Sequence, residues 1–389
     1  MSTTNDGPLK GVKVLEATQF ISGPFAGQQL ADMGADVIKV ERPGVGDPIR
    51  NYASGQAPQY GPNFVAVNRN KRSVTLDLQS EEGISTFKAL AAKSDVVLEN
   101  FRPGVMDRLG IGYEDLKKEN PGIIYCAIAG FPIDGPYAKR PAFDTIGQAS
   151  SGMLYLFTDP ENPSLRGPTL SDQVSGLYAA NAIQSALIER FRTEKGRRID
   201  LSMMDASIAF MPDAFACYTE IGIEWDSSFR AAMSHCLLMQ CKNNETLAIH
   251  MGGQDPVWKS FLKAANREDI ITDPRFEDRD ERIKNWGKLI EELRPVFAEA
   301  SRSEWMQRLV EAKVPAADVL TIPEVLEDPA VKQSQLFETN QHPVAGKVTM
   351  MRRPALFDGE RGGPQRPAAL LGEHTEEVLK EYGIIQSEN

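Results

Sequence analysis

The sequence predicts an α/β protein, with a parallel sheet flanked by helices and followed by a smaller α+β domain. Short apolar runs alternate with helical segments through the first half of the chain, which is typical of strands buried in a parallel sheet. After about residue 205, two neighbouring strand-like runs and several charged amphipathic helices replace this alternation. With 389 residues, of which 41% are apolar, the chain is long enough to bury the cores of two or three domains.

Five strands and two helices are expected in the first half. One helix spans about 23–34, where Pro24 suits the first turn. The other spans 80–93, with Ser80 as its N-cap and two glutamates in its first turn. The strands are short apolar runs between polar or glycine residues, at 12–17, 35–41, 72–78, 94–100 and 122–130.

The later part of the chain predicts the smaller domain. The run "SHCLLMQCKNNETLAIHMGG" indicates two strands around the polar turn Lys242–Asn244. Three charged amphipathic helices are expected from about Pro256 to Ala312. A strand-bearing segment at 346–358 and a final helix at 373–383 complete the pattern.

The stretch "GPTLSDQVSGLYAANAIQSALIER" carries a carboxylate, Asp172, at the start of a helix rich in small residues. By pattern alone, the favoured interpretation is a helix cap, either as a capping box from Thr169 to Asp172 or with Ser171 as the cap. Behind it, one face of the helix is expected to pack closely through Gly176, Ala179, Ala180, Ile183 and Leu187.

Composition argues against several classes of partner and cofactor. A net charge of -11 argues against nucleic acids and membrane surfaces as partners. The first ten residues have no apolar signal region, and no apolar run approaches the length of a membrane helix. Two of the four cysteines, Cys236 and Cys241, flank an apolar run, which favours buried thiols and a reduced, cytoplasmic protein. The four histidines form no metal-binding pattern, so no metal site is expected.

The loop after the first strand does not match a dinucleotide-binding loop. It contains only Gly23 and Gly27, and the G-x-G-x-x-G pattern that allows close approach to a pyrophosphate is absent. Basic residues at expected strand ends could still bind phosphates, although most charged residues of this kind are simply exposed to solvent and bind no ligand. These residues are Arg42, Arg50, Lys71, Arg72, Arg102 and Arg108.

Several linked motifs along nearly the whole chain together resemble one family. They include "GPFAGQQLADMGADVIKVERPGVGDPIR", "NRNKRSVTLDLQSEEG", "SDVVLENFRPGVMDRLGIGYEDLK", "GFPIDGPYAKRPAFD", "GRRIDLSMMDAS", "GGQDPVW" and "GEHTEEVL". In these motifs the chain is similar to the class III CoA-transferases, the CaiB/BaiF family that includes formyl-CoA transferase.

The resemblance implies a particular architecture. A Rossmann-like large domain is built from residues 1–205 and from a return segment at 326–389, with a smaller α+β domain at 230–325 between them. Two copies form an interlocked homodimer, and the stretch from Gly362 to Ala369 belongs to the return path over the partner.

The resemblance also implies that Asp172 is a nucleophile. A carboxylate can attack an acyl-CoA thioester and pass the CoA to a carboxylic acid acceptor through an enzyme thioester. Coenzyme A is then a substrate, and no tightly bound cofactor is expected. A helix N-terminus favours an ionised carboxylate, so capping and nucleophilic roles are compatible.

The family's CoA contacts and mobile glycine loop can be located in this sequence, with two departures. Ile21 stands where formyl-CoA transferase-like sequences have glutamine, with Gln19 two residues earlier, which leaves oxalate or formyl specificity open. The family lysine falls near Pro141, so Lys139 or Arg140 could contact a phosphate instead. The resemblance places CoA contacts at Arg42, Leu76, Gln79, Asn100, Phe101, Arg108 and Met203, and the glycine loop at Gly252 and Gly253.

Two other functions are compatible with the same scaffold. An α-methylacyl-CoA racemase needs two acid/base groups flanking the α-carbon. Here no histidine precedes Asp172, and the residue before Asp144 is Phe143, whose ring accepts no proton. A non-catalytic acyl-CoA-binding protein is the other alternative, and the presence of Asp172 argues against it.

Overall fold

The computed structural model describes residues 7–53, 55, 57–159, 161–362 and 366–386, and it separates the chain into two compact units. The first unit comprises Met1–Leu154, Arg166–Pro212 and Lys332–Asn389. The second comprises Tyr155–Leu165 and Asp213–Val331. We describe each unit by itself.

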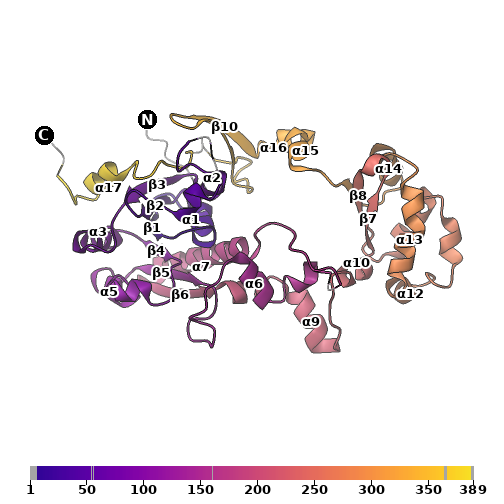
Figure 1. Cartoon of the computed structure of the whole chain (residues 1–389), viewed down its shortest axis with the longest axis horizontal. Helices are drawn as coiled ribbons and strands as arrows, with labels where there is room; N and C mark the ends of the chain where they lie inside the picture. Colours follow the sequence, from indigo (N-terminus) through magenta and orange to yellow (C-terminus); the bar gives the residue numbers. More distant parts are fainter. Residues whose placement is uncertain (1–6, 54, 56, 160, 363–365, 387–389) are drawn as a thin grey trace. The chain divides into compact units, whose positions relative to one another are not determined.

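A six-stranded parallel sheet forms the centre of the first unit, which confirms the predicted α/β fold (Figure 1). The strand order β3-β2-β1-β4-β5-β6 reverses direction between β1 and β4, and ligands of such sheets bind at the carboxyl ends of the strands beside that reversal. The strands are β1 (Lys13–Ala17), β2 (Asp36–Glu41), β3 (Lys71–Thr75), β4 (Val96–Glu99), β5 (Ile124–Ala129) and β6 (Arg197–Ser202).

The sequence does not predict strand β6. This strand, RRIDLS, lies at the edge of the sheet and is largely exposed or half-buried, so it can be mostly polar. The hydrophobic pattern that predicts central strands is therefore missing at this edge.

Helices cover both faces of the sheet. Helices α1 (Ser22–Asp32) and α7 (Ser171–Thr193) pack against one face, with Val14, Leu98 and Ile183 in the shared core. Helices α3 (Glu81–Ala91), α5 (Tyr113–Glu119) and α17 (Thr375–Glu381) cover the other face (Figure 1). The N-cap predicted for α3 is confirmed, since the Ser80 hydroxyl accepts the Gly83 N–H at 3.0 Å.

The C-terminal part of the chain returns to the first unit. Strands β10 (Phe337–His342) and β11 (Gly346–Met351) form an antiparallel hairpin, and Val348 and Met350 share a core with Phe64. The Pro/Gly-rich stretch from Gly362 to Ala369 lies partly outside the described residues. Shorter helices complete this unit: η1 (Pro48–Asn51), α2 (Pro62–Asn68), α4 (Val105–Arg108), α6 (Asp144–Ser150) and α8 (Met203–Ala209).

The second unit packs helices on a small antiparallel sheet of β7 (Cys236–Gln240), β8 (Thr246–His250) and β9 (Ala316–Asp318). The prediction of three amphipathic helices is wrong, because four α-helices occur there: α11 (Asp255–Ala264), α12 (Arg279–Lys284), α13 (Trp286–Phe297) and α14 (Arg302–Glu311). Asn285 leaves the helical conformation and separates α12 from α13, a break that the continuous charged pattern does not indicate.

Further short elements belong to the second unit or link it to the first. They are η2 (Tyr155–Phe157), α9 (Pro212–Ile221), α10 (Phe229–Met233), η3 (Lys242–Asn244), η4 (Glu268–Thr272), α15 (Ile322–Glu327) and α16 (Pro329–Ser334).

Among the described residues, no helix has both the length and the apolar character needed to cross a membrane.

Close packing of α1 on α7 depends on a glycine. The predicted small-residue face of α7 is confirmed as buried, and a Cβ at Gly176 would lie 2.8 Å from the Ser22 carbonyl oxygen and 2.9 Å from the Phe25 ring. A side chain at position 176 would therefore push the two helices apart.

We expect Gly176→Leu to lower the free energy of unfolding by about 2–3 kcal/mol, because the larger side chain overpacks this interface. Urea denaturation followed by circular dichroism measures the change. Asn181→Leu, which adds the same side chain at an exposed position of α7, is the matched control and should change stability by less than about 0.5 kcal/mol. Equal stability of the two variants would contradict the packing argument.

Candidate active site

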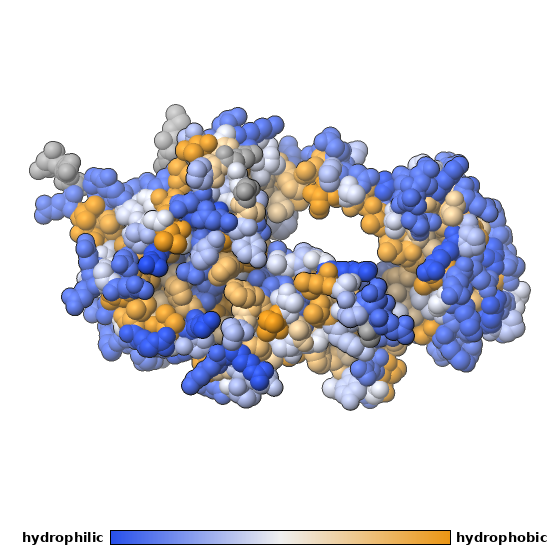
Figure 2. Space-filling model, in the orientation of Figure 1, coloured by the Kyte–Doolittle hydropathy of each residue, from blue (hydrophilic) through white to orange (hydrophobic). Residues whose placement is uncertain are grey.

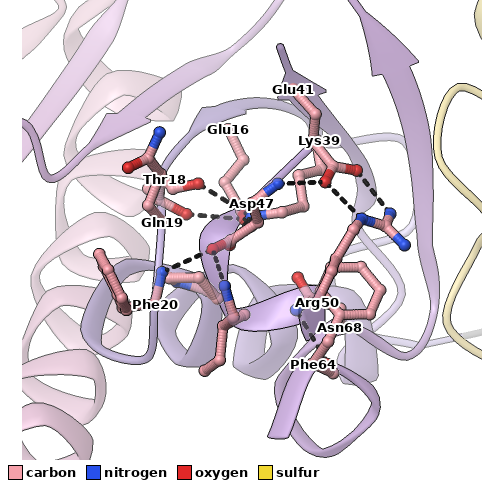
Figure 3. Close-up of polar contacts among 12 residues, drawn as sticks. Glu16, Thr18, Gln19, Phe20, Lys39, Glu41, Asp47, Arg50, Phe64 and Asn68 are labelled. Carbon is pink, nitrogen blue, oxygen red and sulfur yellow. Dashed lines mark hydrogen bonds and ion pairs between the residues drawn. The ribbon is translucent and has the colours of Figure 1, made fainter. Parts of the chain in front are cut away.

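Six buried charges lie beneath the carboxyl ends of β1 and β2 and the loops that follow them, and Figure 3 labels all of them except Lys71. Lys39 Nζ lies 3.2 Å from Glu16 Oε1 and 3.0 Å from Asp47 Oδ2. Lys71 Nζ lies 2.8 Å from Glu16 Oε2. Arg50 donates two hydrogen bonds of 2.7 Å to the two oxygens of Glu41. Three carboxylates and three cations therefore balance one another; we call them the ion network.

The electrostatics of the ion network keep Glu41 and Lys39 charged. Burial alone would raise the pKa of Glu41, but the hydrogen bonds from Arg50 and the charge of Lys39 lower it below its usual value. Burial opposes charge on Lys39 as well, and the carboxylates of Asp47 and Glu16 nevertheless raise the pKa of this lysine. For Lys71 burial outweighs the attraction of Glu16 and lowers the pKa to about 8.

The glycines of the first loop make room for this network. A Cβ at Gly27 would overlap the Glu16 carboxylate, and one at Gly23 would lie 2.5 Å from the side chain of Thr18. These glycines therefore allow α1 to pack over Thr18 and the buried Glu16.

The loop Thr18–Ile21 is held in a strained shape. Phe20 has φ = 61°, in the left-handed region that a bulky residue rarely adopts. Its N–H donates to Asp47 Oδ1 at 3.1 Å, and Asn100 clamps the preceding residue through two hydrogen bonds of 2.8 Å to the Gln19 backbone. Such strain persists only where the surroundings determine the backbone, and it is common at functional sites.

Two cavities adjoin this loop. One, of about 300 Å³, is lined by four of the predicted CoA contacts, Arg42, Leu76, Gln79 and Phe101. The other, of about 290 Å³, is lined by Asn100, Phe101, Asp172 and Met203. Gln19 and Phe101 line both, so the two cavities share these residues as part of their walls.

The remaining predicted site residues lie elsewhere. Arg108 is exposed on α4 and lines neither cavity. Gly252 and Gly253 follow β8 in the second unit and have φ of 62° and 69°. A side chain at position 253 would be strained by this backbone and would meet Arg279 Nε at 3.0 Å. Ile21 lines neither cavity, whereas Gln19 lines both.

Asp172 lies at the start of α7, and the predicted cap is wrong. Helix α7 begins at Ser171, and its N-cap residue, Leu170, makes no side-chain cap. The Ser171 hydroxyl instead donates to the Met203 carbonyl at 3.4 Å and accepts from Ser207 at 2.8 Å. The Asp172 N–H is bound by the side chain of Asp144 on α6, at 3.1 Å.

The Asp172 carboxylate itself has no hydrogen-bond partner within the part of the chain that the structure describes, and it lines the second cavity. Burial, and then the charge of Asp144, raise its pKa to about 7. The expectation that the helix N-terminus favours the ionised form is therefore outweighed, because the side chain is only 9% exposed.

Some residues of this site were not predicted from the sequence. Phe20 carries no sequence signal, because nothing in the sequence indicates that a phenylalanine adopts the left-handed backbone conformation there. Glu99 positions Phe101: its carboxylate accepts the Phe101 N–H at 2.7 Å and the Tyr125 hydroxyl at 3.3 Å. Burial raises the pKa of Glu99 to about 7. Within the described ranges, no three His, Cys, Asp or Glu side chains are grouped so that they could hold a metal ion.

Comparisons with known proteins match this chain along nearly its whole length. The model of the family described as CoA-transferase family III matches residues 9–375. The human succinyl-CoA:glutarate CoA-transferase is 32% identical over 97% of this chain and 86% of that protein. The acetyl-CoA:oxalate CoA-transferase of Acetobacter aceti is 34% identical over 98% of this chain and 97% of that protein.

A solved structure is also similar to this chain. The crystal structure of a CaiB/BaiF family protein from Brucella suis superposes with a TM-score of 0.84 at 32% sequence identity. The match covers 97% of this chain and 100% of the other.

We expect Asp144→Asn to lower the pKa of Asp172 by about one unit, because the substitution removes a neighbouring negative charge and keeps an oxygen to accept the Asp172 N–H. The pKa should stay above 3.8, since burial is unchanged. Carbon-13 NMR titration of labelled aspartates measures it, with the resonance assigned by its loss in Asp172→Asn.

The half-buried Asp115, whose partner is Lys118, provides the control, and Asp115→Asn should leave the Asp172 titration unchanged. An Asp172 pKa that is the same in Asp144→Asn and in the native protein would show that burial alone sets it.

Proposed function

The chain belongs to CoA-transferase family III and is a CoA-transferase, and from this premise we propose that Asp172 carries the CoA from an acyl-CoA donor to a carboxylic acid acceptor. The single observation that carries this proposal is the position of the Asp172 carboxylate, buried at a helix N-terminus, facing a cavity, and without a hydrogen-bond partner among the described residues.

The proposed reaction has four steps. A carboxylate oxygen of Asp172 attacks the thioester carbonyl carbon, forming a mixed anhydride and expelling the CoA thiolate. The thiolate attacks the Asp172 carbonyl carbon, which forms an aspartyl-CoA thioester and releases the donor acid as a carboxylate. The acceptor carboxylate then attacks this thioester, giving a second anhydride and free thiolate. The thiolate finally attacks the acceptor's carbonyl carbon, which yields the new acyl-CoA and restores the carboxylate.

No proton is gained or lost in this cycle, so the enzyme needs no general acid or base. The surroundings of Asp172 likewise offer no free acid or base beside it among the described residues. Asp144, the nearest charged group, is already engaged by the Asp172 N–H and by Gln148 Nε2, which donates to it at 2.6 Å.

The two adjoining cavities support a CoA path. We place the adenine end in the cavity lined by Arg42, Leu76 and Gln79, and the thioester in the cavity lined by Asp172. The pantetheine arm then passes Phe101, which lines both. By the same proposal the loop of Gly252 and Gly253 covers the site during the reaction.

The acceptor is proposed to be a dicarboxylic acid. Relatives of this chain are named for transfer to glutarate, oxalate and mesaconate, which are all dicarboxylic acids.

We also propose that the chain forms an interlocked homodimer. Each unit leaves large apolar side chains exposed on a helix, and Figure 2 shows apolar patches on the face in view. Exposed apolar residues that are grouped in this way indicate an interaction surface. They include Leu177, Ile188 and Phe191 on α7, and Phe215, Tyr218 and Ile221 on α9.

Replacing the proposed nucleophile tests the mechanism. We expect Asp172→Asn to lower CoA transfer by about a thousandfold or more, because an amide cannot form the anhydride. In the native protein, incubation with an acyl-CoA and then hydroxylamine should give a hydroxamate at position 172, found by peptide mass spectrometry. Asp205→Asn is the control and should keep transfer and the adduct.

Full transfer by Asp172→Asn, or an adduct on another residue, would contradict the mechanism. Exchange of the α-proton of a 2-methylacyl-CoA in deuterated water at a turnover rate would favour a racemase instead.

The dimer is tested by mass and by subunit exchange. Light scattering should give twice the mass of one chain. Tagged and untagged dimers mixed under native conditions should form no hybrids, because linked subunits separate only on unfolding, and refolding the mixture should produce hybrids. A monomer, or rapid exchange without denaturant, would contradict the interlocked dimer.

A further inference from the structure

The cavity around Asp172 contains an arginine whose charge is unused. Arg140 and Arg102 both line this cavity and are exposed, and neither guanidinium has a hydrogen-bond or ion-pair partner among the described residues. Of the two, Arg140 is the one that stacks on an aromatic ring there. An unpaired guanidinium in a ligand cavity is suited to bind an anion.

The guanidinium of Arg140 is held by an aromatic side chain. Its central carbon lies 3.8 Å from the centre of the Tyr137 ring, which itself makes an edge-to-face contact with the buried Phe131 at 5.6 Å. Stacking on the flat face of the guanidinium leaves its N–H edges available for a planar carboxylate.

The chain links Arg140 directly to the reacting carboxylate. Four residues after Arg140 comes Asp144, whose side chain binds the Asp172 N–H at 3.1 Å. Four residues span at most about 14 Å. The segment from Arg140 to Asp144 thus connects Arg140 to the residue that binds the Asp172 backbone, and Arg140 and Asp172 line the same cavity.

The part of the cavity wall formed by Phe20 and residues 141–143 is apolar. Phe20 and Phe143 meet edge to face, with ring centres 5.3 Å apart, and both line the cavity. Phe143 is 62% exposed. Pro141 and Ala142 continue the wall towards Arg140. A hydrocarbon chain fits against such a surface, and a second carboxylate at its end would meet the cation.

We propose that Arg140 determines specificity by binding the distal carboxylate of an aliphatic dicarboxylic acid, whose hydrocarbon chain lies against Phe20 and Phe143 while its other carboxylate reacts through Asp172. This inference rests on the proposed function. It assigns the second carboxylate to one residue of this chain, and Lys139, the adjacent basic residue, lines neither cavity.

A CoA phosphate is the competing anion for Arg140, and kinetics distinguish the two. If Arg140 binds the distal carboxylate, its substitution lowers kcat/KM for dicarboxylic acceptors alone. If Arg140 binds a CoA phosphate, its substitution lowers kcat/KM equally for every acceptor and raises KM for the acyl-CoA.

The experiment compares glutarate with pentanoate, which has the same number of carbons and lacks the second carboxylate. Acetyl-CoA is the donor, because its acyl group makes no use of Arg140. In the native enzyme we expect kcat/KM to favour glutarate by at least about tenfold. Arg140→Gln should lower kcat/KM for glutarate by about thirtyfold and that for pentanoate by less than about threefold, with KM for acetyl-CoA unchanged.

Two further variants sharpen the result. Arg140→Lys, which keeps the charge and loses the fork of N–H donors, should retain part of the preference for glutarate. Lys139→Gln, the matched control, should keep the native preference. Circular dichroism and urea denaturation should give native values for all three, since both side chains are exposed.

An equal loss for both acceptors, a raised KM for acetyl-CoA with an unchanged preference, or a native enzyme that prefers pentanoate would overturn this assignment and leave the proposed function intact. A native enzyme that transfers CoA from no acyl-CoA donor would overturn the proposed function, and this assignment with it.

Discussion

The ion network of Glu16, Lys39, Glu41, Asp47, Arg50 and Lys71 is the constraint on which the site depends. Each of these side chains is at most 4% exposed, so each charge is stable only with its partners in place. Removing one partner of such a buried pair costs about 3–5 kcal/mol, because the remaining charge has no solvent to stabilise it. The network therefore fixes the strand ends and the loops after β1 and β2 as one rigid body.

The rigidity of this body appears in the backbone that it supports. Asp47 belongs to the network through Lys39, and its second oxygen binds the N–H groups of Phe20 and Ile49. A left-handed phenylalanine costs of order 1–3 kcal/mol, and the hydrogen bonds from Asp47 and Asn100 offset that cost. The strain holds the Phe20 ring against Phe143 and leaves Gln19 between the two cavities. A charge network thereby determines the shape of an apolar wall.

The sequence predicts those parts of this fold that follow from hydrophobic periodicity. All five strands expected in the first half occur and are largely buried, although β3 itself (KRSVT) is mostly polar, and the small face of α7 is buried as its spacing indicates. Strand β6 could not be predicted, since its exposed edge lacks that pattern. The helix cap at Asp172 was wrong for a different reason. Serine at position 171 favours a cap locally, but Ser207 and the Met203 carbonyl, more than 30 residues away, engage its hydroxyl. Contacts of this kind are tertiary, and local pattern contains no information on them.

The environment of Asp172 is understandable once the chemistry is considered. A helix N-terminus would favour an ionised carboxylate, yet burial and Asp144 raise its pKa to about 7. A pKa near neutrality leaves part of the protein with an ionised carboxylate that is ready to react at neutral pH. Withholding solvent and hydrogen bonds from the carboxylate leaves its oxygens unoccupied, which favours attack on a thioester. Asp144 contributes a neighbouring negative charge and also accepts the backbone N–H of Asp172. The cap is thus supplied by a second carboxylate, and the first is left available for the reaction.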